Sequence, residues 1–476
     1  MLAACGGLAA CAVGPDYRTP TVSTPAHWSG AADAPAKAPE LSQWWLRLDD
    51  PTLNTLIDQA VRGNLDVAAA KARVREARAS YRQARGALFP TLDASASVTR
   101  NDTGAGSASA SGSNLVKAGF DASWEMDLFG ANRRAAEAAR YGQDAADEDL
   151  RSTLLTLIGD VAADYVDARG YQARIALARR TAVSQRQTAA LTEAKFAAGS
   201  VSAADVASAA GLAASTEADI ATLEAAYAEA VHQLSVLLGR DPEALSDLLA
   251  TPAPPPAPPA DVAMGVPADI LLARPDVREA ERKLAQYTAK IGQAQAARYP
   301  AVSLTGSIAT SGGSLGDLAK QSSISWSYGP SVSLPIFEGG QLAAAVDVAR
   351  AQRDEYDVAF RAAVLTALED VENASVSLSR ERVRNERLDA SAKAYRQANA
   401  LALSLYRAGS TSFLEALDAE RSQYSAEDAL IQSNVLIATD YIALNKALGG
   451  GWDGVVDASK PEVVDVDTGP RLARPH

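Results

Sequence analysis

The chain has 476 residues, which is room for about three average domains and a large buried core. Its net charge of −13, from 45 basic and 58 acidic side chains, excludes a nucleic-acid-binding role, because such proteins need a basic surface. Its three histidines are scattered and its two cysteines both precede Ala12, so a disulfide framework and a Cys/His metal cluster are excluded.

The N-terminus is small and apolar, and residues 1–10 are interpreted as the remnant of a lipoprotein signal. Leu8-Ala9-Ala10-Cys11 matches the short motif at which bacterial lipoproteins are cleaved before the cysteine that receives lipid. Leu2-Ala3-Ala4-Cys5 fits the same pattern, and the alternative is two ordinary cysteines in an alanine-rich leader. Residues 11–50 are predicted to form an extended N-terminal surface segment.

The rest of the chain contains two copies of one unit, repeat 1 at 51–250 and repeat 2 at 267–449. Motifs of the two copies stand 210 positions apart: Leu65-Asp66-Val67 and Pro275-Asp276-Val277, Pro90 and Pro300, Ala198-Gly199-Ser200 and Ala408-Gly409-Ser410, Leu238-Gly239 and Leu448-Gly449. A proline-rich linker, 251–266, separates the copies and is expected to be extended. A C-terminal tail, 450–476, completes the chain.

Each repeat begins with a helix and continues into two segments in which apolar and polar residues alternate. These segments are about 91–100 and 115–129 in repeat 1, and about 301–311 and 323–337 in repeat 2. A strict period of two predicts strands with one apolar and one polar face, each long enough to cross a bilayer when tilted. The alternative, for either hairpin taken singly, is a hairpin in a soluble sheet.

A very long helix is predicted after each pair of strands, at 131–198 and at 341–408, because glycine and proline are nearly absent there. Apolar residues spaced by three and four predict a seam for helix packing: Leu150, Leu154, Leu157, Val161 and Tyr165, with Phe360, Val364, Ala367 and Val371. Return helices are predicted at 203–238 and 413–448. Each follows a tight turn in which glycine adopts a left-handed conformation and a hydroxyl side chain caps the next helix.

Four strands cannot close a barrel, and unpaired strand edges are not tolerated in lipid, so the sequence predicts an oligomer. A dimer would give eight strands, whose interior is filled by side chains. A trimer would give twelve strands and room for a water-filled lumen.

With these features the chain resembles the TolC-like outer-membrane factor family, closest to its lipoprotein branch of drug-efflux channels. The resemblance covers essentially the whole chain and rests on three motifs: Cys11-Ala-Val-Gly-Pro-Asp-Tyr-Arg-Thr-Pro20, Trp44-Trp45 through Asp50-Pro51-Thr-Leu53 and Leu56-Ile57, and Asn64-Leu65-Asp66. It implies an α+β membrane channel in the outer membrane of a Gram-negative bacterium. The channel would be a homotrimer with a 12-stranded β-barrel and a periplasmic α-barrel, anchored by lipid on Cys11.

The resemblance also assigns the two helix-to-helix turns to a periplasmic tip that meets a membrane-fusion adaptor. The residues of these turns are Gly199, Ser200, Asp205, Gly409 and Ser410. It further assigns the periplasmic aperture to Leu414, Glu415 and Asp418, of which the first and last share a helix face, so three copies would form an apolar and an acidic ring. The family more usually has Asp at 415, and the alternative is that both acids stabilise a helix N-terminus.

The predicted function is the exit channel of a tripartite efflux system that passively exports small molecules, such as drugs or toxic compounds. An inner-membrane pump would deliver them through the adaptor. The sequence has no G-x-S-x-G, G-x-x-x-x-G-K or H-E-x-x-H motif, so we expect neither an enzyme nor a cofactor or metal. Two alternatives stay open: a periplasmic coiled-coil adaptor or scaffold, and the outer-membrane channel of a type I protein-secretion system.

Overall fold

The computed structural model describes residues 12–22, 25, 28, 41–101, 113–260, 274–452, 454 and 456–460. The predicted signal remnant 1–10, Cys11 and parts of the linker and tail lie outside the described residues. The elements in chain order are η2 (Trp44–Leu48), α1 (Pro51–Gly63), α2 (Leu65–Gly86), β1 (Thr91–Asn101), β2 (Ser113–Glu125), α3 (Ala131–Ala197), α4 (Ala203–Leu237), α5 (Ser246–Leu249), α7 (Pro275–Ala296), β3 (Ala301–Gly312), η3 (Leu315–Ala319), η4 (Gln321–Ser323), β4 (Ile324–Ser333), α8 (Gln341–Ala408) and α9 (Phe413–Ala447).

The chain forms two compact units. The first comprises the described residues of Met1–Val22, Arg73–Asp147 and Glu279–Ala362, and it contains all four strands. The second comprises those of Ser23–Ala72, Glu148–Arg278 and Ala363–His476, and it is built from helices. Each unit is described by itself below.

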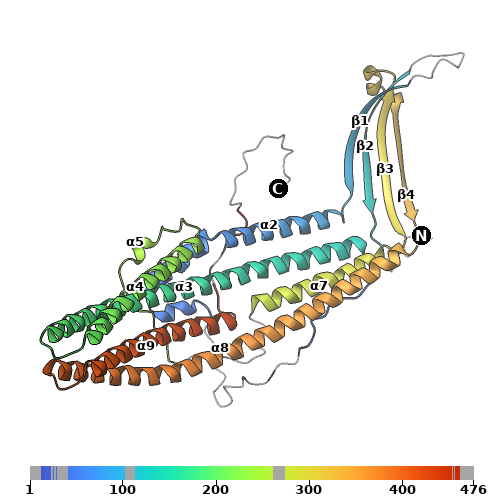
Figure 1. Cartoon of the computed structure of the whole chain (residues 1–476). Coiled ribbons are helices and arrows are strands. Elements are labelled where there is room, and N and C mark those ends of the chain that lie inside the picture. Colours follow the sequence, from blue (N-terminus) through green and yellow to red (C-terminus); the bar gives the residue numbers. More distant parts are fainter. Residues whose placement is uncertain are drawn as a thin grey trace. The chain divides into compact units, whose positions relative to one another are not determined.

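The four strands of the first unit form one antiparallel sheet in the order β1-β2-β3-β4, side by side in Figure 1. Its register aligns the alternation of all four strands, so that one row across the sheet reads Ala94, Phe120, Ile308 and Trp326. The adjacent row reads Asp93, Asp121, Ser307 and Ser327. The sheet therefore has one apolar and one polar face. Large apolar side chains are exposed on all four strands, with Trp326 at 70%, although Val116 is only 7% exposed.

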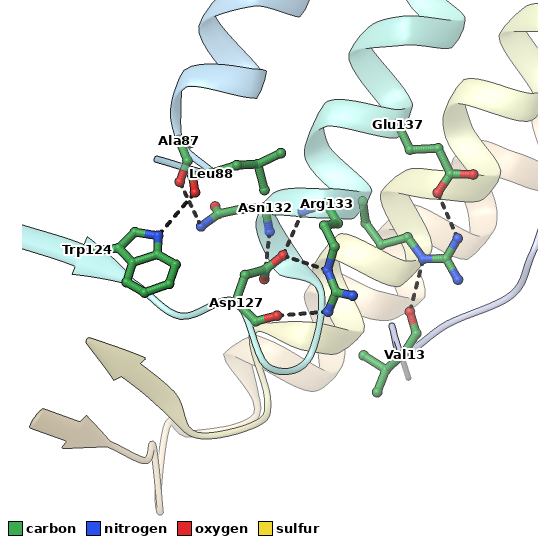
Figure 2. Close-up of polar contacts among 9 residues, drawn as sticks. Val13, Ala87, Leu88, Trp124, Asp127, Asn132, Arg133 and Glu137 are labelled. Carbon is green, nitrogen blue, oxygen red and sulfur yellow. Dashed lines mark hydrogen bonds and ion pairs between the residues drawn. The ribbon is translucent and has the colours of Figure 1, made fainter. Parts of the chain in front are cut away.

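Two strands end earlier than the alternation predicts. The segment expected at 115–129 is a strand only to Glu125, because the Asp127 carboxylate accepts hydrogen bonds from the backbone amides of Asn132 (3.0 Å) and Arg133 (2.9 Å) at the start of α3 (Figure 2). Asp127 therefore fits the polar position of the alternation but caps α3 instead of continuing the strand.

In the second repeat, the segment expected at 323–337 is a strand only over Ile324–Ser333. Pro335 has no amide hydrogen to give to the sheet. Gly339 and Gly340 then take φ values of 58° and 86°, which turn the chain into α8.

The long helices α3 and α8 lie where the repeat predicts them, with 67 and 68 residues. The predicted apolar seam is buried on both helices, from Leu150 at 7% exposure to Tyr165 at 0% on α3, and from Phe360 at 5% to Val371 at 0% on α8. Among the described helices, none is both long enough and apolar enough to span a membrane.

The end of the N-terminal segment departs from the surface location predicted for 11–50. Trp44, Trp45 and Leu48, in the 3-10 helix η2, are at most 4% exposed and belong to the core of the second unit. The Trp44 indole contacts the Tyr441 ring edge-on at 6.0 Å between centroids, and Trp45 stacks on Trp452 at the same distance. The burial of two adjacent indoles explains why this stretch folds as an element of the core.

Candidate functional site

The two turns between the long and the return helices have the same backbone geometry. Gly199 and Gly409 both have φ of 76°, the left-handed conformation that glycine adopts without strain. The amide of Ser200 donates to the carbonyl of Lys195 and that of Ser410 to the carbonyl of Leu405, both at 2.9 Å. These bonds, with Gly199 to Phe196 and Gly409 to Tyr406 at 2.8 and 3.1 Å, end each helix in a Schellman motif.

The return helices begin with hydroxyl caps, but the acidic residue behind each cap is used differently. Ser202 caps α4. The backbone amide and the hydroxyl of Ser202 both donate to the Asp205 carboxylate at 2.9 Å. Ser412 caps α9 by accepting the Glu415 amide at 3.4 Å. In the described part of the chain, the Glu415 and Asp418 carboxylates have no hydrogen bond or ion pair. Helix capping therefore accounts for Asp205 and leaves these two carboxylates unused.

The first turns of α9 separate an outward face from an inward one. Leu414 is 67% exposed, and Glu415 and Asp418 are exposed beside it. Phe413 and Ala416 are 4% and 0% exposed and pack in one cluster with residues of α4 and α8. The helix thus presents the proposed aperture residues away from the core that joins the two turns.

Near the two turns, α8 contacts α3 through Tyr406, a residue that the sequence analysis did not predict to be functional. Tyr406 is 1% exposed, and its hydroxyl lies 2.9 Å from the Thr192 hydroxyl. The Lys195 ammonium donates to the Tyr406 carbonyl at 2.6 Å and lies 4.5 Å from the centre of its ring. The repeat contained a signal for it, because the equivalent position in the first copy is also aromatic, Phe196.

A second missed residue is a carboxylate buried between α3 and α9. Glu420 is 4% exposed and accepts hydrogen bonds from Thr188 (3.0 Å) and Ser184 (3.2 Å). Burial raises the pKa of Glu420 above its usual range, and the two hydrogen bonds oppose that rise. Sequence periodicity could not reveal it, since glutamate in a helix is normally solvated.

The proposed lipid anchor, Cys11, lies outside the described residues, but the segment that follows it is held firmly. The Val13 amide donates to the Phe129 carbonyl at 3.1 Å, at the end of the strand-to-helix connection. Arg134, 5% exposed, donates to the Val13 carbonyl at 3.3 Å, the contact drawn to Val13 in Figure 2. It also donates to the Gly14 carbonyl at 3.3 Å and pairs with Asp16 at 2.7 Å. These contacts hold residues 13–16 at the junction of β2 and α3.

The described residues include no group of three or more histidine, cysteine, aspartate or glutamate side chains placed to hold a metal ion. The arrangement at the turns consists of caps, apolar contacts and exposed carboxylates. Such a set can bind a partner and present charge, and it has no paired nucleophile and base.

Comparison with known proteins gives a consistent result over the whole chain. The family model described as "Outer membrane efflux protein" matches residues 56–240 and 266–450, two spans that stand 210 positions apart like the repeats. Nodulation protein T of Rhizobium leguminosarum bv. trifolii is 36% identical over 453 residues, which cover 95% of this chain and 97% of that protein. The toluene efflux pump outer membrane protein TtgI of Pseudomonas putida is 33% identical, over 94% of this chain and 96% of that protein.

A solved structure described as that of the outer-membrane channel OprN is also similar. It superimposes with a TM-score of 0.87 at 36% sequence identity and covers 93% of this chain and all of that one.

Proposed function

The chain belongs to the outer membrane efflux protein family, and from this premise we propose that it is the passive exit duct of a tripartite efflux system. The resemblance to TolC-like outer-membrane factors is confirmed, and with it the fold class and the location in the outer membrane. Members of this family are channels, and we propose that this chain performs no chemistry of its own.

The observation that carries the proposal is the sheet of the first unit. Large apolar side chains are exposed on each of the four strands, and among the described strands β1 and β4 each pair on one side only. A sheet of this kind in lipid must find partners for both edges, so we infer closure by further copies of the chain. Three copies give twelve strands, enough to surround a water-filled lumen.

A stripe of exposed aliphatic side chains on α8 supports association of the helices as well. At about 100° per residue, its members in the second unit fall within roughly 40° of one another around the helix axis. They are 48–66% exposed: Leu365, Val376, Val383, Leu401 and Leu405. A stripe of this size on a long helix is typical of a surface that another helix covers.

The internal repeat indicates which helix would cover it. Within the chain, the long helix of repeat 1 packs on the return helix of repeat 2, through Arg174 and Asp428 (2.6 Å) among others. The matching contact would join α8 of repeat 2 to α4 of repeat 1, and it is available between two copies of the chain. Val166 on α3 is fully buried, whereas its equivalent on α8, Val376, is 48% exposed. We therefore propose that α8 packs against α4 of the next copy in a homotrimer.

The aperture and the docking tip are proposed for the end of the molecule where the long helices turn. Three copies of Leu414, Glu415 and Asp418 would bring an apolar ring and acidic side chains together around the pore axis. The adaptor would meet the turns around Gly199, Ser200, Asp205, Gly409 and Ser410. An inner-membrane pump would supply the cargo, which we propose to be small molecules, as the name of the toluene-efflux relative indicates for that protein.

Conductance across planar lipid bilayers tests the channel and its aperture together. We expect the purified protein to conduct, and the double variant Glu415→Ala/Asp418→Ala to conduct several-fold more, because charge and bulk at the narrowest ring are removed. The matched control is Glu229→Ala/Glu386→Ala, two acids exposed on α4 and α8. Equal conductance of the two double variants would refute the aperture assignment, and absence of any conductance would refute the channel in favour of a periplasmic scaffold.

A further inference from the structure

Aromatic residues stand at every junction between a helix and a strand of the sheet. Phe89 precedes β1, Phe129 follows β2, Tyr299 precedes β3 and Phe337 follows β4. Phe89, Tyr299 and Phe337 are 61%, 44% and 88% exposed, and Phe129 stacks on Tyr299 at 4.8 Å between ring centroids. Aromatic girdles of this kind mark the level at which a membrane-spanning sheet leaves the hydrocarbon.

The helical segments that lead into the two entering strands are basic, although the chain as a whole is acidic. Residues 77–90, before β1, and 287–300, before β3, contain five basic side chains and no acidic one, in a chain with a net charge of −13. The two segments are repeat equivalents, but their charges occupy different positions: Arg78, Arg82 and Arg85 in the first, Lys290 and Arg298 in the second. Both repeats therefore have a positively charged segment here, but the basic residues do not lie at equivalent positions.

Most of these charges are available to an outside partner. Arg78 pairs with Asp147 at 3.3 Å. Arg82, Arg85 and Arg298 are exposed, and within the described ranges no carboxylate forms an ion pair with any of them. Arg85 lies over the Tyr81 ring, 5.8 Å from its centre, an arrangement that leaves the guanidinium edge accessible.

The connection between α2 and β1 lies on the apolar side of the sheet. Trp124 belongs to the apolar row of β2, where it stands opposite Leu304 of β3. Its indole nitrogen donates to the Leu88 carbonyl at 3.1 Å, as Figure 2 shows. The side-chain amide of Asn132 reaches the neighbouring Ala87 carbonyl at 3.5 Å. The connection from α2 to β1 therefore borders the face that the proposed channel turns toward lipid.

We propose that these residues form a junction belt that binds anionic phospholipid headgroups of the periplasmic leaflet of the outer membrane. The belt consists of the four junction aromatics with Arg82, Arg85 and Arg298, and the inference rests on the proposed function, which sets the sheet in the membrane. Guanidinium groups bind phosphate through paired hydrogen bonds, and aromatic rings occupy the same headgroup level. The belt holds the channel at a fixed depth, with the helices below the bilayer and the strands within it.

Lipid binding to the intact, detergent-solubilised protein tests the belt. Bound lipids are counted by native mass spectrometry during titration with phosphatidylglycerol or with phosphatidylcholine of the same acyl chains. We expect a preference for phosphatidylglycerol that weakens from 50 to 500 mM salt, as screening requires. In R82Q/R85Q/R298Q the preference should fall at least fivefold, since one basic group near a charged membrane surface contributes roughly a fivefold factor. At the same ionic strength, inorganic phosphate should compete only weakly, because it lacks the acyl chains that the junction aromatics contact.

The control is R180Q/R380Q/R387Q, which removes three exposed arginines of α3 and α8 from the second unit. It should keep the full lipid preference. Retention of the preference by R82Q/R85Q/R298Q, or its equal loss in the control, would overturn the inference. Conductance of the same samples in phosphatidylcholine bilayers distinguishes failure of the belt from failure of the proposed channel function. A wild type that conducts but shows no lipid preference overturns only the belt. A wild type that does not conduct overturns the channel itself.

Discussion

Replacement of Asp164 by asparagine should stabilise the protein at alkaline pH. Asp164 lies on α3 in the second unit, and in the described part of the chain its buried Oδ2 has no hydrogen-bond partner. Burial, followed by the nearby Asp167 and Asp160 carboxylates, raises the pKa of Asp164 to about 7 from 3.8. At pH 8 the native state must therefore hold an ionised carboxylate where the neutral form is preferred.

The sign of the pH dependence follows from the direction of this shift. A carboxyl group whose pKa is raised by folding binds its proton more tightly in the native state, so stability falls as the pH rises from about 4 to about 7. A shift of about three units corresponds to at most about 4 kcal/mol at pH 8, and solvent screening of a partly exposed group reduces this to about 2 kcal/mol. At pH 5 the gain from asparagine should shrink to less than about 1 kcal/mol.

Thermal unfolding followed by helical circular dichroism in detergent measures the effect. Asp164→Asn should raise the midpoint by roughly 2–4 °C at pH 8 and by much less at pH 5. Asp219→Asn, at an exposed position of α4, is the matched control and should leave both midpoints unchanged. A change in the midpoint that is the same at both pH values would refute the reasoning, because it would not come from ionisation.

Two further predictions concern the helix ends. Gly199→Ala should lower the free energy of unfolding by about 1 kcal/mol, because φ is 76° but no other described atom lies within 4 Å of the added methyl group. Gly239→Ala should lower it several times more, since its methyl group would overlap the Gly63 carbonyl. Thermal unfolding midpoints measure both effects. Tyr406→Phe should cost about 1 kcal/mol through loss of the buried hydrogen bond to Thr192 and should raise channel conductance by loosening α3 from α8.

The controls for these predictions lie on the same helices. Tyr395→Phe changes a tyrosine of α8 that is 43% exposed and should alter neither midpoint nor conductance. Equal costs at Gly199 and Gly239 would contradict the packing argument, and an unchanged midpoint for Tyr406→Phe would show that its hydroxyl contributes no net stability.

The elements of this fold could be predicted because the same signals occur twice. The left-handed glycines at 199 and 409, and the alternation of apolar and polar residues along each strand, are local features that the sequence shows directly. The strand ends were overestimated, since period-two alternation runs on through Asp127 and does not reveal that this carboxylate caps α3. A tertiary contact decided that position.

The burial of polar and aromatic residues was harder to predict from the sequence. Trp44 and Trp45 lie in a stretch of weak periodicity. The aromatic rings that they contact, Tyr441 and Trp452, lie about 400 residues further along the chain. The aperture residues came from a family pattern, whereas Tyr406 and Glu420 show their roles only through contacts to α3. Long-range packing of this kind leaves no periodic trace in a single sequence.

The exposed apolar face of the sheet has a consequence for how the molecule is made. A single copy presents that face, two open edges and the α8 stripe to its surroundings at once, which makes it prone to aggregate in water. For the proposed homotrimer we therefore expect insertion of the strands into the membrane to be coupled to association of the copies. Substitutions in the α8 stripe, such as Val383→Asp, should then reduce the amount of channel that reaches the membrane, while the channels that do assemble conduct normally.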